Sequence, residues 1–152
     1  ELLVVVTVFA FLGVLLTNSL FSILRSNTKS ELIKEIRQNG SFALDVMTKK
    51  LTGGRSPDCR INPNRVFFID GDGKTITFKC GDGIIASESG EITTYLVGQD
   101  KFKVTDCSFS CKEAGAYYKV TINFTLSQPG TSTRQEELAR QSFSKVILVR
   151  NQ

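Results

Sequence analysis

The sequence predicts an α+β fold in which one long N-terminal α-helix packs against an antiparallel β-sheet. The first 23 residues after Glu1 carry no charge, the next stretch keeps a helical spacing of apolar residues, and the remainder alternates apolar and polar residues between glycine-containing turns. One helix followed by a run of strands is typical of this class. We therefore expect an apolar helix at 1–24, its amphipathic continuation at 25–54 and a disulfide-containing sheet domain at 55–152.

The uncharged run extends from Leu2 to Leu24. As an α-helix it is about 35 Å long, enough to cross the ~30 Å hydrocarbon core of a bilayer. A secretory signal peptide would begin with basic residues, have a shorter apolar run and end at a small-residue cleavage site. Residues 1–24 have none of these features. The run therefore predicts a membrane helix, with an ordinary signal anchor as an alternative.

Glu1 places a single carboxylate at the edge of this run. An unpaired charge in hydrocarbon is energetically costly, so the simplest explanation for Glu1 is that its side chain lies among the lipid headgroups. The order of Glu1, the apolar segment Leu2–Val6, an apolar run containing Gly13, and an amphipathic continuation resembles the type IV pilins and the pseudopilins of type II secretion. In that family the mature chain begins with a methylated phenylalanine, and an invariant glutamate follows four residues later. The resemblance implies that Glu1 is this glutamate, and we expect a leader and four further residues before it.

The resemblance implies a structural subunit that assembles into a type IV pilus or pilus-like filament. Glu1 would serve docking, by pairing with the N-terminal amine of a neighbouring subunit. The implied partners are copies of the chain, other pilins and an assembly platform in the inner membrane, where the protein would reside before it moves into an extracellular filament. The filament-core positions of the helix would be Leu2, Val5, Phe9, Gly13, Leu16 and Leu20.

Two places in the expected helix contain poor helix formers. Gly13 and the run 17–19, Thr-Asn-Ser, weaken the backbone ladder of the apolar part. The resemblance implies that this stretch loses helicity in a filament, and a small-residue packing surface is the alternative. Asn39-Gly40 predicts a kink or break at 39–41, since glycine costs about 1 kcal/mol relative to alanine.

The amphipathic continuation has one apolar face, and Gly53-Gly54 is expected to end the helix. That face contains Leu32, Ile33, Ile36, Ala43, Leu44, Met47 and Leu51.

Beyond Ser56 the spacing of apolar residues changes from the helical pattern to the apolar–polar alternation that is typical of strands. A hairpin is expected where 65–70 and 75–80 flank the turn 71–74. Residues 128–141 read as a polar loop with a short helical turn at 136–140, and the ending 143–151 is similar to the last strand of minor pilins and pseudopilins. Further strands are expected at 84–87, 92–97, 102–109, 117–127 and 143–150.

Four cysteines, an even number, indicate two disulfides in an oxidising compartment. Three pairings are open, and we favour Cys59–Cys80 with Cys107–Cys111, because each bond then closes a local loop. A zinc site is an alternative, but the chain has no histidine and no cysteine pair at two-residue spacing.

The residue types give no constellation for catalysis, so we expect no enzyme, no metal and no cofactor. The absence of histidine removes the commonest general base. Asp70-Gly71-Asp72 lacks the later ligands of a calcium loop and fits a tight turn better. The net charge is +4, but the Lys and Arg residues are scattered among acidic residues, so the sequence gives no specific support for a nucleic-acid partner. An alternative function is a minor or tip pilin, or a pseudopilin, whose domain binds DNA, a surface or a secretion substrate.

Overall fold

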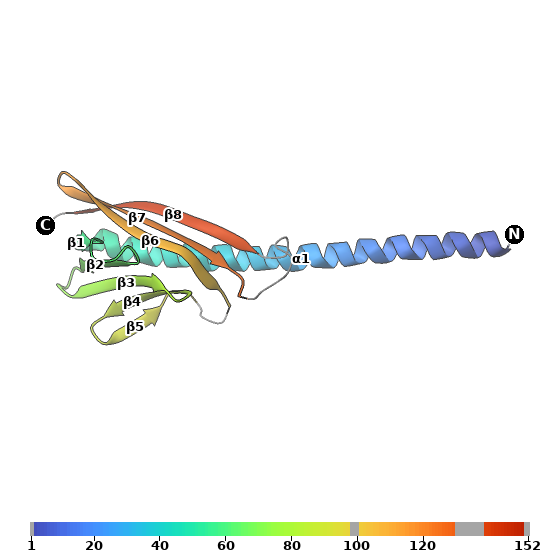
Figure 1. Ribbon diagram of the computed structural model, residues 1–152, viewed down its shortest axis with the longest axis horizontal. Coiled ribbons are helices and arrows are strands. Elements are labelled where there is room, and N and C mark those ends of the chain that lie inside the picture. Colours follow the sequence, from blue (N-terminus) through green and yellow to red (C-terminus); the bar gives the residue numbers. More distant parts are fainter. Residues whose placement is uncertain (1, 98–100, 130–138, 151–152) are drawn as a thin grey trace.

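The computed structural model describes residues 2–97, 101–129 and 139–150, except for the side chains of 2, 24, 25 and 28. It has the predicted α+β architecture: one helix and an eight-stranded, mostly antiparallel sheet. The helix α1 comprises Leu2–Gly53, about 78 Å at 1.5 Å per residue. The sheet covers only the C-terminal half of α1, and the N-terminal half projects from the domain (Figure 1). Glu1 lies outside the described residues.

The sheet is built from short strands in the first half of the domain and long ones in the second. Its hydrogen-bonded order is β5-β4-β3-β2-β1-β8-β7-β6, in which only the β1–β8 pair is parallel. Each predicted strand is present. The strands are β1 (Arg55–Asp58), β2 (Arg65–Ile69), β3 (Thr75–Gly81), β4 (Ile84–Ser89), β5 (Ile92–Tyr95), β6 (Lys103–Ala114), β7 (Tyr117–Ser127) and β8 (Arg140–Arg150).

The core lies between the second half of α1 and the inner face of the sheet. The helix contributes Ile36, Ala43, Met47 and Leu51, all fully buried, as their spacing predicts. Aromatic pairs support the sheet side, with ring centroids 5.3 Å apart for Phe68 and Phe78 and 5.1 Å apart for Phe124 and Phe143. Phe42 is 58% exposed, because it points about 100° away from its buried neighbour Ala43.

The predicted kink at 39–41 is wrong, since α1 is continuous through these residues. The Asn39 side chain donates a hydrogen bond to the carbonyl of Glu35 (2.9 Å) and so stays within the helix. Gly40 is buried, and a Cβ built on it would collide with the ring of Phe143 on β8. The glycine is therefore a contact site that lets β8 approach the helix backbone.

Both predicted turns around this core are present. The helix ends at Gly53, and the Gly54 amide donates to the carbonyl of Leu51 (3.1 Å). In the β2–β3 hairpin the Asp70 carboxylate accepts hydrogen bonds from the amides of Asp72 and Lys74, both at 3.0 Å, and Gly73 has φ +79°. Asp70 therefore closes a tight turn. The helical turn expected at 136–140 falls mostly outside the described residues, and Arg140 begins β8.

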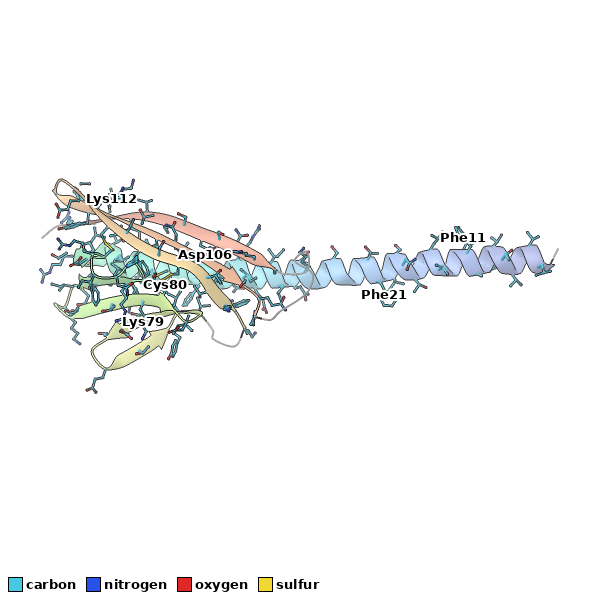
Figure 2. All side chains as sticks on the ribbon, viewed as in Figure 1. Phe11, Phe21, Lys79, Cys80, Asp106 and Lys112 are labelled. Carbon is cyan, nitrogen blue, oxygen red and sulfur yellow. A yellow bond between two sulfur atoms is a disulfide. The ribbon has the colours of Figure 1, made fainter. Side chains whose placement is uncertain are left out.

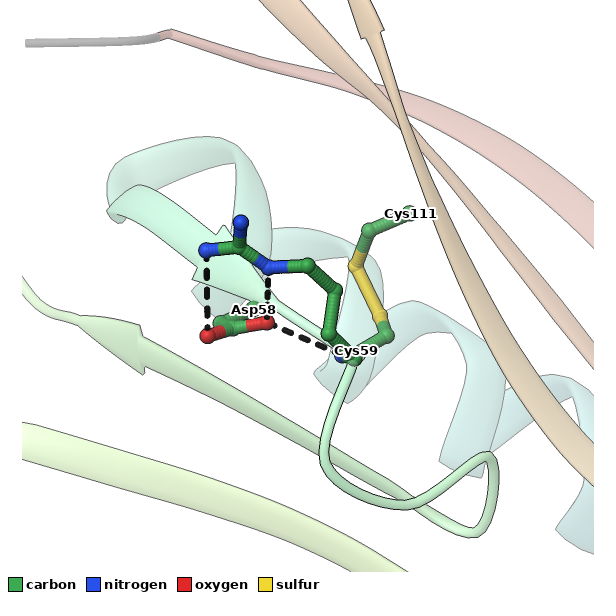
Figure 3. The surroundings of a disulfide bond; sticks show 4 residues. Asp58, Cys59 and Cys111 are labelled. Carbon is green, nitrogen blue, oxygen red and sulfur yellow. Dashed lines mark hydrogen bonds and ion pairs between the residues drawn. A yellow bond between two sulfur atoms is a disulfide. The ribbon is translucent and has the colours of Figure 1, made fainter.

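The predicted disulfide pairing is wrong: the bonds join Cys59 to Cys111 (Figure 3) and Cys80 to Cys107. Cys107 and Cys111 lie four residues apart in β6, about 13 Å along a strand, whereas bonded cysteines have Cα atoms less than about 7 Å apart. Cys59 and Cys80 belong to opposite sides of β2, about two strand spacings apart. The Cα distances of the observed bonds are 5.5 and 6.1 Å.

These bonds fasten the β6 end of the sheet to its first half. The Phe109 amide on β6 also donates to the carbonyl of Pro63 (2.6 Å), and the Val104 amide donates to that of Gly83 (2.9 Å). The sheet therefore curls until β6 meets β3 and the β1–β2 connection. The disulfides enclose 52 and 27 residues, and each one alone is worth about 3–4 kcal/mol in the chain-entropy estimate.

The Gly40 contact leads to a stability prediction. Gly40→Ala should destabilise the folded domain by up to about 2 kcal/mol, because overpacking costs about 1–3 kcal/mol and alanine returns about 1 kcal/mol of helix propensity. Gly53→Ala is the matched control, because nothing lies within 4 Å of a Cβ at that helical position. Thermal unfolding of the detergent-solubilised chain measures both. Equal stability of the two variants would contradict this account of the contact.

The disulfide pairing leads to a thiol count. The double variant Cys59→Ala/Cys80→Ala should expose two free thiols per chain, because Cys107 and Cys111 cannot bridge within one strand. Cys59→Ala/Cys111→Ala should expose none, because the Cys80–Cys107 bond is retained. Titration of the unfolded, unreduced protein with a thiol reagent gives the counts. The reverse result would support the pairing of Cys59 with Cys80 and of Cys107 with Cys111 instead.

Candidate functional site

The free half of α1 is the most unusual surface of this molecule. Leu3–Ile23 is long and apolar enough to cross a membrane, and none of it is buried by the rest of the described chain. Its large apolar side chains keep 47 to 80% of their surface exposed. Figure 2 shows Phe11 and Phe21 projecting from the helix well away from the domain. Such a surface requires lipid or other apolar helices to cover it.

The predicted core positions lie on this surface. Val5, Phe9, Leu16 and Leu20 are exposed, and nothing lies within 4 Å of a Cβ built on Gly13. Val5, Phe9, Gly13, Leu16 and Leu20 follow one another at three- and four-residue spacing, so they share one face of the free helix. Leu2 is helical, but its side chain is not among those described, and the docking position Glu1 lies outside the described residues.

The threonines of this segment meet their hydrogen-bonding needs within the helix. The Thr7 hydroxyl lies 3.0 Å from the Leu3 carbonyl and 2.8 Å from the Val4 carbonyl, and the Thr17 hydroxyl donates to the Gly13 carbonyl at 2.8 Å. Such bonds lower the cost of polar groups in hydrocarbon. Residues 13–19 are helical in the isolated chain. The expected loss of helicity in a filament stays a prediction.

Asn18 differs from these threonines. Within the described part of the chain its exposed amide has no hydrogen-bond partner. It was noted in the sequence only as a poor helix former, and its apolar surroundings are the signal that would have identified it earlier.

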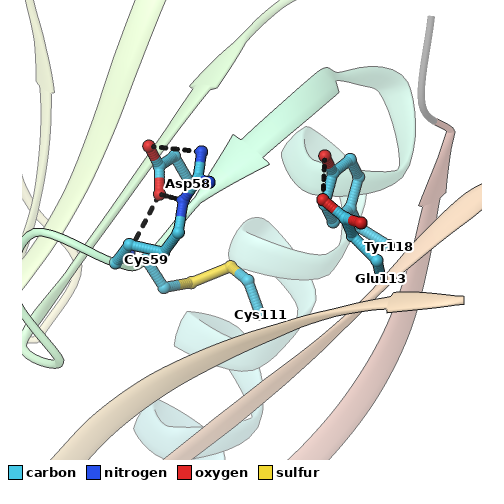
Figure 4. Close-up of polar contacts among 6 residues, drawn as sticks. Asp58, Cys59, Cys111, Glu113 and Tyr118 are labelled. Carbon is cyan, nitrogen blue, oxygen red and sulfur yellow. Dashed lines mark hydrogen bonds and ion pairs between the residues drawn. A yellow bond between two sulfur atoms is a disulfide. The ribbon is translucent and has the colours of Figure 1, made fainter.

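At the opposite end of the molecule, a polar cluster surrounds the Cys59–Cys111 bond (Figure 4). The Asp58 carboxylate accepts hydrogen bonds from the backbone amide (2.9 Å) and Nε (3.1 Å) of Arg60, and the Tyr118 hydroxyl donates to the Glu113 carboxylate (3.1 Å). The bond from Arg60 lowers the pKa of Asp58, and the bond to Glu113 raises the pKa of Tyr118. The sequence does not indicate this cluster, because Asp58 and Arg60 are far from Glu113 and Tyr118 along the chain.

The described residues offer no metal centre: no group of three or more of their Cys, Asp and Glu side chains could hold an ion. The Glu88 carboxylate forms an ion pair with Lys79 on the neighbouring strand.

No family model, no curated protein and no solved structure matches the chain. The apolar helix and sheet domain are compatible with a pilin-like fold, and this compatibility rests on architecture alone.

The Tyr118–Glu113 bond leads to a pH prediction. Glu113→Gln should lower the pKa of Tyr118, because the neutral amide no longer opposes the phenolate. With its pKa raised, Tyr118 contributes stability that is present below the ordinary tyrosine value of about 10 and is lost as the pH rises through the folded-state pKa. Ultraviolet titration of the variant against Glu91→Gln, an exposed control, measures the shift. Identical titration curves would contradict the assignment.

Proposed function

We propose that this protein is a pilin-like structural subunit, held in the inner membrane by its apolar half-helix and then packed into a pilus or pilus-like filament. The observation that carries the proposal is the free segment Leu3–Ile23, which continues without a break into the helix that anchors the domain. One unbroken helix serves both a lipid environment before assembly and a helix bundle afterwards. No step of this membrane insertion and assembly requires a cofactor.

The free energy at stake supports packing of this segment. Burying one large aliphatic or aromatic side chain is worth about 1.5–3 kcal/mol. The segment exposes more than ten such side chains, so water is an unfavourable environment by more than about 10 kcal/mol. Lipid covers them in the membrane, and neighbouring copies of α1 cover them in a filament. Close packing then replaces lipid contacts without a loss of apolar burial.

The charge distribution fits the same division of labour. All charges except Glu1 lie beyond residue 24, so the domain is polar and remains outside the apolar layer. In a filament the domain would form the outer surface, and Glu1 would be the single carboxylate among packed helices. Such a carboxylate requires a cationic partner. The N-terminal amine of a neighbouring subunit is the partner that the family resemblance implies.

This role of Glu1 leads to a functional prediction. Glu1→Ala should leave the protein in the membrane and reduce its incorporation into filaments by about 10- to 100-fold, the value of a hydrogen bond to a charged group. Glu91→Ala, in an exposed turn before β5, is the control. Mass spectrometry of sheared surface filaments and of membranes gives the two amounts. Normal incorporation of Glu1→Ala would count against the proposal.

The same fractions separate a major from a minor subunit. A chain that dominates the sheared filaments is the structural pilin, and one present in trace amounts is a minor or tip subunit, whose domain then becomes the candidate for binding DNA, a surface or a secretion substrate. Complete absence of the chain from filaments would leave an ordinary membrane-anchored domain.

A further inference from the structure

Asn18 lies well inside the apolar span. It is five residues before Ile23, the end of the Leu3–Ile23 segment, so its Cα lies about 8 Å from that end along the helix. An amide without a hydrogen-bond partner is unfavourable in hydrocarbon. The side chain is short, which limits its reach towards the headgroups. A partner for it must therefore be sought at its own depth.

The helix itself does not supply that partner. The only polar side chains between Leu3 and Ile23 are Thr7, Thr17, Asn18, Ser19 and Ser22. The hydroxyls of Thr7 and Thr17 already donate to carbonyls of their own helix. Within the described residues no hydrogen bond reaches the Asn18 amide. The complementary group must come from another molecule.

The neighbours of Asn18 form a stripe suited to a second helix. Val4, Phe11 and Asn18 are spaced by seven residues, and Val14 and Phe21 follow three residues after the latter two. This is the a/d spacing by which two parallel helices pack, and all four apolar members are exposed. A single asparagine at an a position costs stability but fixes the register and number of helices.

We propose that Asn18 pairs with Asn18 of a second copy of this chain, in a parallel, in-register helix pair that forms in the membrane before assembly. The amide is self-complementary, since each N–H donates to the carbonyl of the other copy. Copies that share one insertion direction are necessarily parallel. This inference rests on the proposed membrane stage of the function and identifies the residue that sets the pairing there.

The test uses the full chain, reconstituted in vesicles of phosphatidylethanolamine and phosphatidylglycerol. Ser22→Cys places a thiol one turn from Asn18, and it is the only free thiol because all four native cysteines are paired. Disulfide cross-linking at increasing protein-to-lipid ratios gives the dimerisation constant. Adding Asn18→Leu, which keeps the size but removes the amide, should weaken dimerisation about 3- to 30-fold.

Two further variants isolate the amide. Thr17→Val in the Ser22→Cys chain should leave dimerisation unchanged, because that hydroxyl is bonded within its own helix. Asn18→Gln should retain most of it, because the amide is kept. Equal dimerisation of the Asn18→Leu and parent chains would overturn the pairing, as would an equal loss in Thr17→Val or no dimer at all in the parent.

Filament content, measured in parallel, keeps this test apart from that of the function. If Asn18→Leu dimerises normally and the parent chain is still found in filaments, only the pairing is wrong. If the parent chain never appears in filaments although it dimerises through Asn18, the pairing stands and the filament function fails.

Discussion

The contact between the second half of α1 and β8 is the interaction on which the rest of the structure depends. At Gly40 the helix presents bare backbone to the ring of Phe143, which in turn stacks on Phe124 of β7. Strand β8 lies between β1 and β7 in the sheet, so it joins the two halves of the domain. A gap at this contact would loosen the helix from the sheet, because most of the close approaches between α1 and the sheet are made by β8.

The disulfides act on the opposite side of the same assembly. In the hydrogen-bonded order β6 is an end strand, and an exposed end strand invites pairing with another chain. Its bonds to Cys59 and Cys80 and its two backbone hydrogen bonds turn that edge against the first half of the domain. The free edge that is left in the described sheet is β5, a strand of only four residues. This arrangement is compatible with the proposed assembly through the helix and not through the sheet.

Local patterns in the sequence predicted most of the helix and strands but little of how distant segments pair with one another. The helix and seven strands follow from spacing and turn residues, because those signals act over a few positions. Strand β1 was missed because its four residues contain Pro57 and Ser56, which has φ +52°, and show no alternation; it exists because Arg55 pairs with Arg150, 95 residues later. The cysteine pairing failed for the same reason, because the curl that brings β6 to Cys80 is a property of the whole sheet. Gly40 was read as a weakness, since the sequence does not show which ring will lie against it.

The unbroken backbone of α1 also sets an angular relation between the domain and the apolar segment. Each residue in a helix advances it by about 1.5 Å and turns it by about 100°. Between Ile23 and Leu32, where the described helix changes from free to packed, one added residue would rotate the whole sheet by more than a quarter of a turn about the helix axis. The number of residues in this connection therefore sets the rotation of the domain about the helix axis. It determines which side of the domain faces outward from any bundle or membrane in which the apolar half is fixed, so insertions here are as consequential as changes to the surface itself.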